Sequence, residues 1–262
     1  MRRRGASLLV ACAASAGAVG LLLRASGTEP RTPEPPVLLL PAAPAPAFSI
    51  PAPAPLDEPH PSARWAAVLR ATAARSAPSS FSPVTGKVDS RTPEGTANLL
   101  LVLGKRVDRR GGLWIRVAIP GLPGHTRGWV PRASLGPYHA VRTRLVVDLG
   151  RLSATLLRDG RSVFRSRIGI GAAASPTPRG EYYIRNRLTS FANRFYGPLA
   201  FGTSARSPSA TDWPDGGFVG IHGTDRPDLL PGRVSHGCIR LRNDDIERLA
   251  RLMPVGTPIS IR

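Results

Sequence analysis

Cysteine is scarce in this chain, whose 262 residues include only Cys12 and Cys238. Two thiols can close one bridge at most, so a scaffold held by several disulfides is excluded. Aromatic residues are also few, at 6% of the chain, and they do not alternate with basic residues along any stripe. Because single-stranded nucleic acid needs aromatic stacking platforms, we expect no nucleic-acid partner.

Lysine is nearly absent, since only Lys87 and Lys105 occur among 36 basic residues, and the rest are arginine. Asp and Glu number 17, which gives a formal net charge of +19. Such a charge is compatible with nucleic acid, anionic lipid or another anionic polymer as a partner. Because the arginines are scattered through every segment, the coding bias of a GC-rich genome explains the charge equally well. The charge alone therefore selects no partner.

Residues 1–28 have the pattern of an export signal, with three arginines before an uncharged stretch over residues 5–23 that is rich in Leu, Val and Ala. This stretch is close to the lower length limit for spanning a bilayer, so the segment is either a cleaved signal peptide or a membrane anchor. A third possibility is lipidation at Cys12, within a lipobox-like Leu-Val-Ala-Cys sequence. All three place the rest of the chain outside the cytoplasmic membrane, in the periplasm or cell wall.

Residues 29–62 contain twelve prolines, many in a repeated Pro-Ala form, and we expect an extended linker there. Residues 63–138 carry short apolar runs broken by Gly and Pro, which is typical of a small antiparallel barrel or sheet. The sequences Gly-Leu-Trp-Ile-Arg-Val and Gly-Trp-Val-Pro in this segment resemble bacterial Src-homology-type barrels. Their tryptophans, Trp114 and Trp129, are expected in the core rather than in a ligand site.

Residues 140–262 show a mostly β pattern that ends in one helix. Alternating apolar residues predict strands over residues 144–149, 154–158, 163–170, 181–185 and 258–261. Asp159 and Gly160 predict a hairpin turn. The helix is predicted to begin with Asp244 as its N-cap and to stop before Pro254. The fold class is therefore mainly β, with a small antiparallel barrel followed by a mixed β domain and its C-terminal helix.

The reactive side chains gather in two short motifs, His222-Gly223-Thr224 and Ser235-His236-Gly237-Cys238-Ile239-Arg240. A thiol becomes a strong nucleophile when a nearby imidazole removes its proton, so a Cys-His pair is a plausible covalent catalyst. His236 is tethered to Cys238 by a single residue, which hinders a good approach of its ring to the sulfur. His222 arrives from a separate segment and is freer to reach it.

The same residues could instead bind a metal, or the thiol could be inert. Zinc bound by His222, His236 and Cys238 lacks a fourth ligand at any usual spacing, so we expect no metal and no cofactor. A buried, inert Cys238 would be a purely structural residue. An exported protein that retains a single thiol exposes it to oxidation, and this retention favours a use for the thiol.

The two motifs together resemble the active-site signature of the L,D-transpeptidases, the YkuD-like enzymes that cross-link peptidoglycan. His222 precedes Cys238 by sixteen residues, and Ser-His-Gly-Cys ends at the thiol. The sequence Ser-Pro-Thr-Pro-Arg-Gly-Glu-Tyr at residues 175–182 is similar to the Thr-Pro-x-Gly turn of that family. Arg240 stands where many members have Asn and one subgroup has Arg.

The resemblance implies a mixed, β-sandwich-like catalytic domain over residues 140–262 and a cysteine-dependent acyltransferase acting in cell-wall biogenesis. Its catalytic residues would be Cys238 as nucleophile and His222 as general base, with the ring oriented by the Gly223 carbonyl. The oxyanion site and its support would come from Ser235, His236 and Gly237. Substrate contacts would come from Arg240, Thr224 and Tyr196, although a surface salt bridge is an equally good role for Arg240.

The substrates that the resemblance implies are peptidoglycan stem tetrapeptides, and it also implies acylation of Cys238 by carbapenems. Residues 191–214 are expected to form either a lid over the substrate or, over residues 195–203, an ordinary strand pair. A hydrolase (L,D-carboxypeptidase) with the same Cys-His site remains an alternative. A non-catalytic wall-binding protein is another alternative, against which the intact motifs speak. The oligomeric state is left open.

Overall fold

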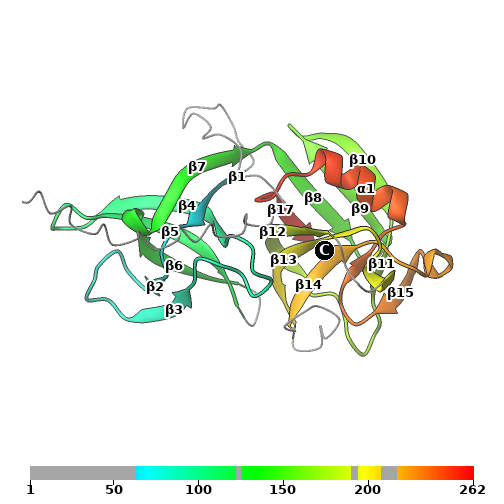
Figure 1. Ribbon diagram of the computed structural model, residues 1–262, viewed down its shortest axis with the longest axis horizontal. Coiled ribbons are helices and arrows are strands. Elements are labelled where there is room, and N and C mark those ends of the chain that lie inside the picture. The colour runs from blue at the N-terminus through cyan, green and yellow to red at the C-terminus, as the bar shows by residue number, and fades with distance from the viewer. Residues whose placement is uncertain (1–62, 122–124, 190–193, 208–216) are drawn as a thin grey trace, which may run out of the picture. The chain divides into compact units, whose positions relative to one another are not determined.

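The computed structural model describes residues 63–121, 125–189, 194–207 and 217–262. All of these residues belong to one compact unit, Pro44–Arg262. The expected signal segment, the linker and parts of the expected lid lie outside the described residues. The described part of the chain forms two sheets and a single α-helix (Figure 1). Within it, no helix has the length and apolar character needed to cross a bilayer.

The first sheet is antiparallel and has seven strands in the order β3-β2-β6-β5-β4-β1-β7. The strands are β1 (Ala63–Val68), β2 (Thr72–Arg75), β3 (Val84–Val88), β4 (Leu99–Val107), β5 (Leu113–Pro120), β6 (His125–Pro131) and β7 (Leu135–Val141), with a short 3-10 helix, η1 (Arg132–Ser134), before β7. Trp114 of β5 is buried, and its indole N–H donates to the Asp108 carboxylate at 2.8 Å. The predicted antiparallel sheet is confirmed, whereas its identity as a Src-homology-type barrel stays a prediction.

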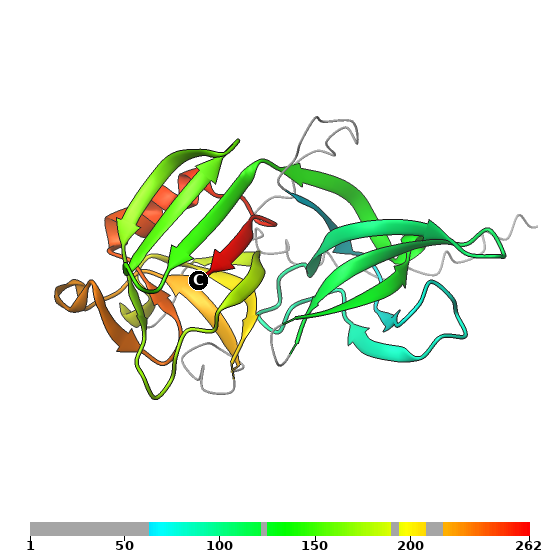
Figure 2. The same ribbon diagram turned by 180° about the vertical axis from the view of Figure 1, so that it is seen from behind.

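The second sheet is curled and mixed, with ten strands in the order β10-β9-β8-β17-β12-β13-β14-β16-β11-β15. The strands are β8 (Thr143–Asp148), β9 (Ser153–Arg158), β10 (Arg161–Arg167), β11 (Gly169–Gly171), β12 (Gly180–Thr189), β13 (Leu199–Arg206), β14 (Phe218–His222), β15 (Gly232–Ser235), β16 (Ile239–Arg240) and β17 (Pro258–Ile261). Two 3-10 helices, η2 (Arg194–Tyr196) and η3 (Pro227–Leu229), precede β13 and β15. Parallel pairing occurs between β8 and β17, β14 and β16, and β11 and β15. Figures 1 and 2 show the molecule from opposite sides. The mainly β fold predicted from the sequence is confirmed.

The hairpin between β9 and β10 turns at the two predicted residues. Asp159 and Gly160 have φ angles of 51° and 76°, in the left-handed region that two-residue hairpin turns require. Asp and Gly tolerate this region better than other residues, which is why the dipeptide predicts the turn. Arg158 and Arg161 pair across the hairpin directly beside it.

The predicted helix is confirmed as α1 (Asn243–Leu252), but the prediction of its N-cap was wrong. Arg242 occupies the cap position, and Asp244 lies in the first turn. The helix begins earlier than predicted, because the Arg242 carbonyl already accepts the Ile246 N–H at 3.0 Å. The side chain of Asn243, the first helical residue, accepts the Thr224 N–H of a neighbouring loop at 2.9 Å. The acidic first turn still complements the positive end of the helix dipole.

The largest hydrophobic core joins residues of both sheets. Trp65 of β1 and Leu99 of β4 belong to the same buried cluster as Leu145, Tyr183 and Ile221 of the second sheet. The Tyr183 hydroxyl donates to the Leu99 carbonyl at 3.2 Å, and burial raises the pKa of this phenol well above its ordinary value. The hydroxyl therefore stays protonated, and the bond to the first sheet persists over the whole physiological pH range.

Candidate active site

Two parallel strands bring the reactive motifs together. In the pairing of β14 with β16, Ile221 lies beside Ile239 and His222 beside Arg240. Side chains alternate between the two faces of a strand, so His222 and Arg240 share a face. Cys238 directly precedes β16. The pairing therefore brings the thiol to the strand that ends in His222.

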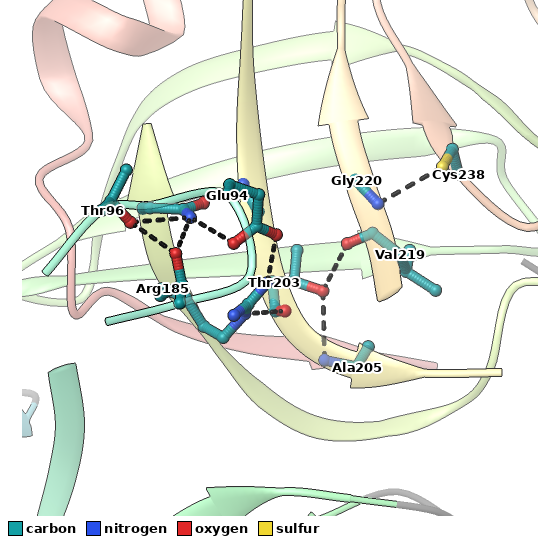
Figure 3. A network of polar contacts seen from close by, with 11 residues as sticks. Glu94, Thr96, Arg185, Thr203, Ala205, Val219, Gly220 and Cys238 are labelled. Carbon is teal, nitrogen blue, oxygen red and sulfur yellow. Dashed lines mark hydrogen bonds and ion pairs between the residues drawn. The ribbon is translucent and has the colours of Figure 1, made fainter. Parts of the chain in front are cut away.

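Cys238 is the only cysteine among the described residues, and it is completely buried. The backbone N–H of Gly220 donates to its Sγ at 3.3 Å (Figure 3). A hydrogen bond donated to sulfur favours the negatively charged thiolate over the neutral thiol. Gly220 thus contacts the thiol through its backbone, a contact that residue type alone does not signal.

The His222 ring is oriented by a backbone carbonyl. Its Nδ1 lies 2.6 Å from the carbonyl oxygen of Gly223. Since a carbonyl only accepts, Nδ1 carries the proton of the neutral ring, and Nε2 is the nitrogen that can take a further proton. The ring is fully buried and contacts two aromatic rings of the η2 segment, with centroid distances of 5.6 Å to Phe195 and 5.1 Å to Tyr196.

The turn before Cys238 is held by a hydroxyl group within it. The Ser235 Oγ donates to the Cys238 carbonyl and accepts the Gly237 N–H at 3.2 Å. Gly237 has a φ of 118°, a backbone conformation that favours glycine. His236 is the exposed residue of this turn, whereas Ser235 is buried.

A second hydroxyl, that of Thr177, stabilises the turn before Cys238 from a different segment of the chain. Thr177 donates to the Gly237 carbonyl at 2.8 Å and accepts the Gly171 N–H at 2.9 Å. Thr177 belongs to the Ser-Pro-Thr-Pro sequence, which resembles a turn of the family and so drew attention to this segment. The sequence did not reveal its contact with Gly237, which joins residues 60 positions apart.

The loop after His222 packs closely against the first residue of α1. Asn243 accepts the Thr224 N–H, and a Cβ added to Gly223 would overlap the Asn243 side chain. Thr224 is buried, and its hydroxyl accepts the Arg226 N–H at 3.0 Å. Asn243 was not expected in the site, because nothing in the helix pattern distinguishes this position from an ordinary start of a helix.

Arg240 is buried, with 5% of its surface exposed, so the expectation of a surface salt bridge was wrong. Its guanidinium carbon lies 4.3 Å from the centroid of the Phe195 ring, and its backbone pairs with His222. Phe195 thus contacts both the His222 ring and the Arg240 guanidinium. Tyr196 was predicted in the site from its place in the sequence, and its ring contacts His222. Its neighbour Phe195, which was not predicted, contacts Arg240 as well as His222.

Most of the predicted residues are brought together around Cys238. His222, Gly223, Arg240 and Tyr196 form one group, and Ser235 and Gly237 shape the turn that presents the thiol. Among the described residues, no group of three or more His, Cys, Asp or Glu side chains is arranged to hold a metal ion. The arrangement is that of a thiol with a neighbouring imidazole, which suits covalent acyl transfer.

Comparison with known proteins gives matches over the second sheet. The sequence profile of the L,D-transpeptidase catalytic domain, named YkuD, matches residues 142–261. A Bacillus subtilis protein named as an L,D-transpeptidase, YkuD, is 34% identical over 145 residues, which cover 55% of this chain and 73% of that protein. ErfK/SrfK of Salmonella typhimurium, also named as an L,D-transpeptidase, is 36% identical over 154 residues, and the chain spans 48% of its length.

Solved structures give weaker likenesses. An L,D-transpeptidase from Mycobacterium tuberculosis has 16% identity and a TM-score of 0.40, with 63% of this chain and 90% of that chain covered. The Enterococcus faecium L,D-transpeptidase has 23% identity and a TM-score of 0.37, with 46% and 50% covered. These TM-scores are too low to add to what the sequence matches establish.

Proposed function

Since this chain belongs to the L,D-transpeptidase family of cysteine-dependent acyltransferases, we propose that it cross-links peptidoglycan through a thioacyl intermediate on Cys238. The observation that carries the proposal is the pairing of β14, which ends in His222, with β16, which follows Cys238, together with the Gly220 N–H directed at the sulfur. This arrangement supplies a nucleophile, a base and a group that stabilises the thiolate. The proposed substrate is a stem tetrapeptide.

In the first step, Nε2 of His222 takes the thiol proton and Sγ of Cys238 attacks the carbonyl that precedes the terminal D-Ala. The tetrahedral intermediate then collapses, the C–N bond breaks, and His222 returns the proton to the departing amine. D-Ala leaves, and the rest of the stem is held as a thioester. The Gly223 carbonyl stabilises the imidazolium while it exists, the part that a carboxylate has in other triads.

In the second step, the amine of a neighbouring stem attacks the thioester carbon. His222 takes a proton from the attacking amine and returns it to the departing thiolate of Cys238, so the enzyme is regenerated. Water in place of the amine gives a tripeptide, which is the carboxypeptidase reaction. Because Cys238 is completely buried in this structure, both steps require the residues that cover the thiol to move.

The remaining site residues receive roles that follow their contacts. We assign the oxyanion site to the Cys238 N–H, because the Gly237 N–H is engaged by Ser235. Ser235 supports this turn, and the exposed His236 lies where a substrate group can reach it.

Three residues are assigned to the substrate side of the site. Arg240, buried next to His222, is assigned to a substrate carboxylate. Tyr196 is assigned to the substrate face of the His222 ring, because its own ring meets the imidazole edge-on. Thr224, whose hydroxyl is engaged by Arg226, acts through the loop backbone.

We propose that the chain is exported and has two domains. Residues 1–28 would export the protein as a signal peptide or anchor, and residues 29–62 would hold it away from the membrane. Residues 63–138 and 140–262 would be two domains that pack on the shared core. The proposed location is the periplasm or cell wall. Carbapenems are proposed as acylating agents, since their strained amide carbonyl is an electrophile for the same thiolate.

The test is product analysis with a purified tetrapeptide-stem muropeptide. We expect mass spectrometry to show cross-linked dimers and release of D-Ala with the wild-type chain, and neither with Cys238→Ala. Tripeptide without dimers would replace the transpeptidase proposal with the carboxypeptidase. Equal product formation by Cys238→Ala would overturn the mechanism.

A further inference from the structure

A buried ion pair connects the segment before β4 to the second sheet. Glu94 lies between β3 and β4, and its Oε1 is 2.7 Å from a guanidinium nitrogen of Arg185 in β12. The two side chains are only 3% and 2% exposed. Removing two charges from water costs several kcal/mol per ion, so such a pair persists only where further hydrogen bonds satisfy both partners.

Both partners have these further contacts. The other carboxylate oxygen of Glu94 accepts the Asn186 side-chain amide at 3.1 Å. The Arg185 Nε donates to the Thr203 carbonyl at 2.8 Å (Figure 3), and its guanidinium lies 3.7 Å from the centroid of the Phe218 ring. Burial lowers the pKa of Arg185, and Glu94 opposes this shift. The carboxylate therefore holds a charged guanidinium against β13 and β14.

From Arg185 the contacts continue to the thiol. The Thr203 hydroxyl donates to the Val219 carbonyl at 2.7 Å. Phe218 and Val219 are the first two residues of β14, and the next residue, Gly220, donates its N–H to Cys238. Figure 3 shows Glu94, Arg185, Thr203, Val219, Gly220 and Cys238 following one another from the carboxylate to the sulfur. The start of the strand that carries the base is thus held by groups that Arg185 contacts.

We propose that Glu94 is a positioning residue for the active site. Through Arg185 and Thr203 it fixes the start of β14, and so it sets where the Gly220 N–H and the His222 ring lie relative to Cys238. Misplacement of catalytic groups by about 1 Å can cost on the order of 100-fold in rate. The segment before β4 therefore contributes to reactivity as well as to stability. The turnover part of this inference rests on the proposed function, whereas the reactivity of the thiol does not.

The test compares Glu94→Gln with a matched control in full-length protein. Glu94→Gln keeps the shape and an acceptor oxygen but removes the charge. The control is Glu181→Gln, which removes the ion pair of Glu181 with Arg144 at 3.2 Å; Glu181 lies on the same strand as Arg185, but its side chain is 66% exposed. The readouts are the rate constant for alkylation of Cys238 by iodoacetamide, and kcat and KM with the stem tetrapeptide. All are measured at a temperature at which circular dichroism shows each variant folded.

We expect Glu94→Gln to lower both the alkylation rate and kcat by on the order of 10-fold, with KM within about 2-fold of wild type. Glu181→Gln should leave all three unchanged. Loosening of the fold alone would expose the thiol and raise the alkylation rate. The direction of the change in alkylation rate therefore distinguishes a positioning role of Glu94 from a purely stabilising one. A folded Glu94→Gln protein with an unchanged or faster alkylation rate, or with an unchanged kcat, would overturn the inference.

A second variant covers the case in which Glu94→Gln does not fold. Thr203→Val keeps the side-chain shape and the carbonyl that Arg185 contacts, but it removes the hydroxyl that donates to Val219. We expect the same pattern of losses, and wild-type alkylation in Thr203→Val would then overturn the inference. If wild type is alkylated but forms no product from stems, the proposed function fails, and the alkylation comparison still decides the role of Glu94.

Discussion

At the scale of single residues, the two reactive side chains are each oriented by the backbone of β14 or of its loop. The Gly220 N–H donates to the sulfur of Cys238, and the Gly223 carbonyl accepts from Nδ1 of His222. Backbone groups move only when the strand or loop moves. The reactivity of the thiol should therefore respond to residues that fix these segments, even where those residues do not touch the substrate.

Loss of the Asn243 side chain is expected to slow the reaction, because this side chain holds the loop that carries the Gly223 carbonyl. Asn243→Ala removes the acceptor of the Thr224 N–H and leaves space beside Gly223. We expect kcat for stem tetrapeptide to fall by roughly 10-fold, since His222 loses its fixed orientation. Steady-state kinetics measure this. Asn243→Asp keeps an acceptor oxygen and should stay near wild type, and full activity in Asn243→Ala would show that the contact is dispensable.

Residue type and spacing predict only part of this site. Cys238 and His222 stand out because thiol and imidazole chemistry is rare in this chain and the spacing of the motifs is specific. Gly220 and Asn243 act through a backbone N–H and an amide oxygen, groups that many residues share. Their roles depend on which segments lie side by side, and that is a property of the folded chain.

At the scale of strands and helices, local signals predict local structure. The turn at Asp159 and Gly160 is predicted by two adjacent residues whose backbone preferences match it. The parallel pairing of β14 with β16 joins segments separated by η3 and β15, so no short sequence pattern signals it. The N-cap of α1 was mispredicted, since the helix begins at Asn243, whose side chain contacts a distant loop that no local pattern reveals.

A side chain at Gly256, between α1 and β17, is expected to destabilise the fold. It has a φ of +81°, and a Cβ there would overlap the buried Trp65 ring of β1. Gly111 has the same φ of +81° but open space around it, so Gly111→Ala is the matched control. We expect Gly111→Ala to cost roughly 1–2 kcal/mol of unfolding free energy from the backbone conformation. Gly256→Ala should cost roughly 1–3 kcal/mol more from overpacking.

Urea denaturation of the two glycine variants measures both costs. Equal losses would mean that the turn and β1 do not pack closely in solution. A larger loss in Gly256→Ala supports the close contact between the turn after α1 and the first sheet.

At the scale of the whole described chain, the two sheets share one hydrophobic core and a buried polar network. Sequence patterns predict the β content of both segments, but they do not reveal that the two sheets share a core and a polar network. Glu94 and Arg185, for example, look like ordinary surface charges in the sequence until their burial is known. The first sheet is therefore expected to affect catalysis, and removal of its contacts should alter the thiol as well as the stability of the fold.

In the proposed mechanism, Cys238 forms a covalent acyl intermediate with a stem tetrapeptide. This intermediate can be detected by intact-protein mass spectrometry after rapid acid quenching of the wild-type chain with the substrate. We expect a mass increase equal to the stem without its terminal D-Ala, located on Cys238 by peptide mapping and absent in Cys238→Ala. Release of D-Ala or formation of dimers without any such adduct, or an adduct on another residue, would rule out the thioacyl intermediate.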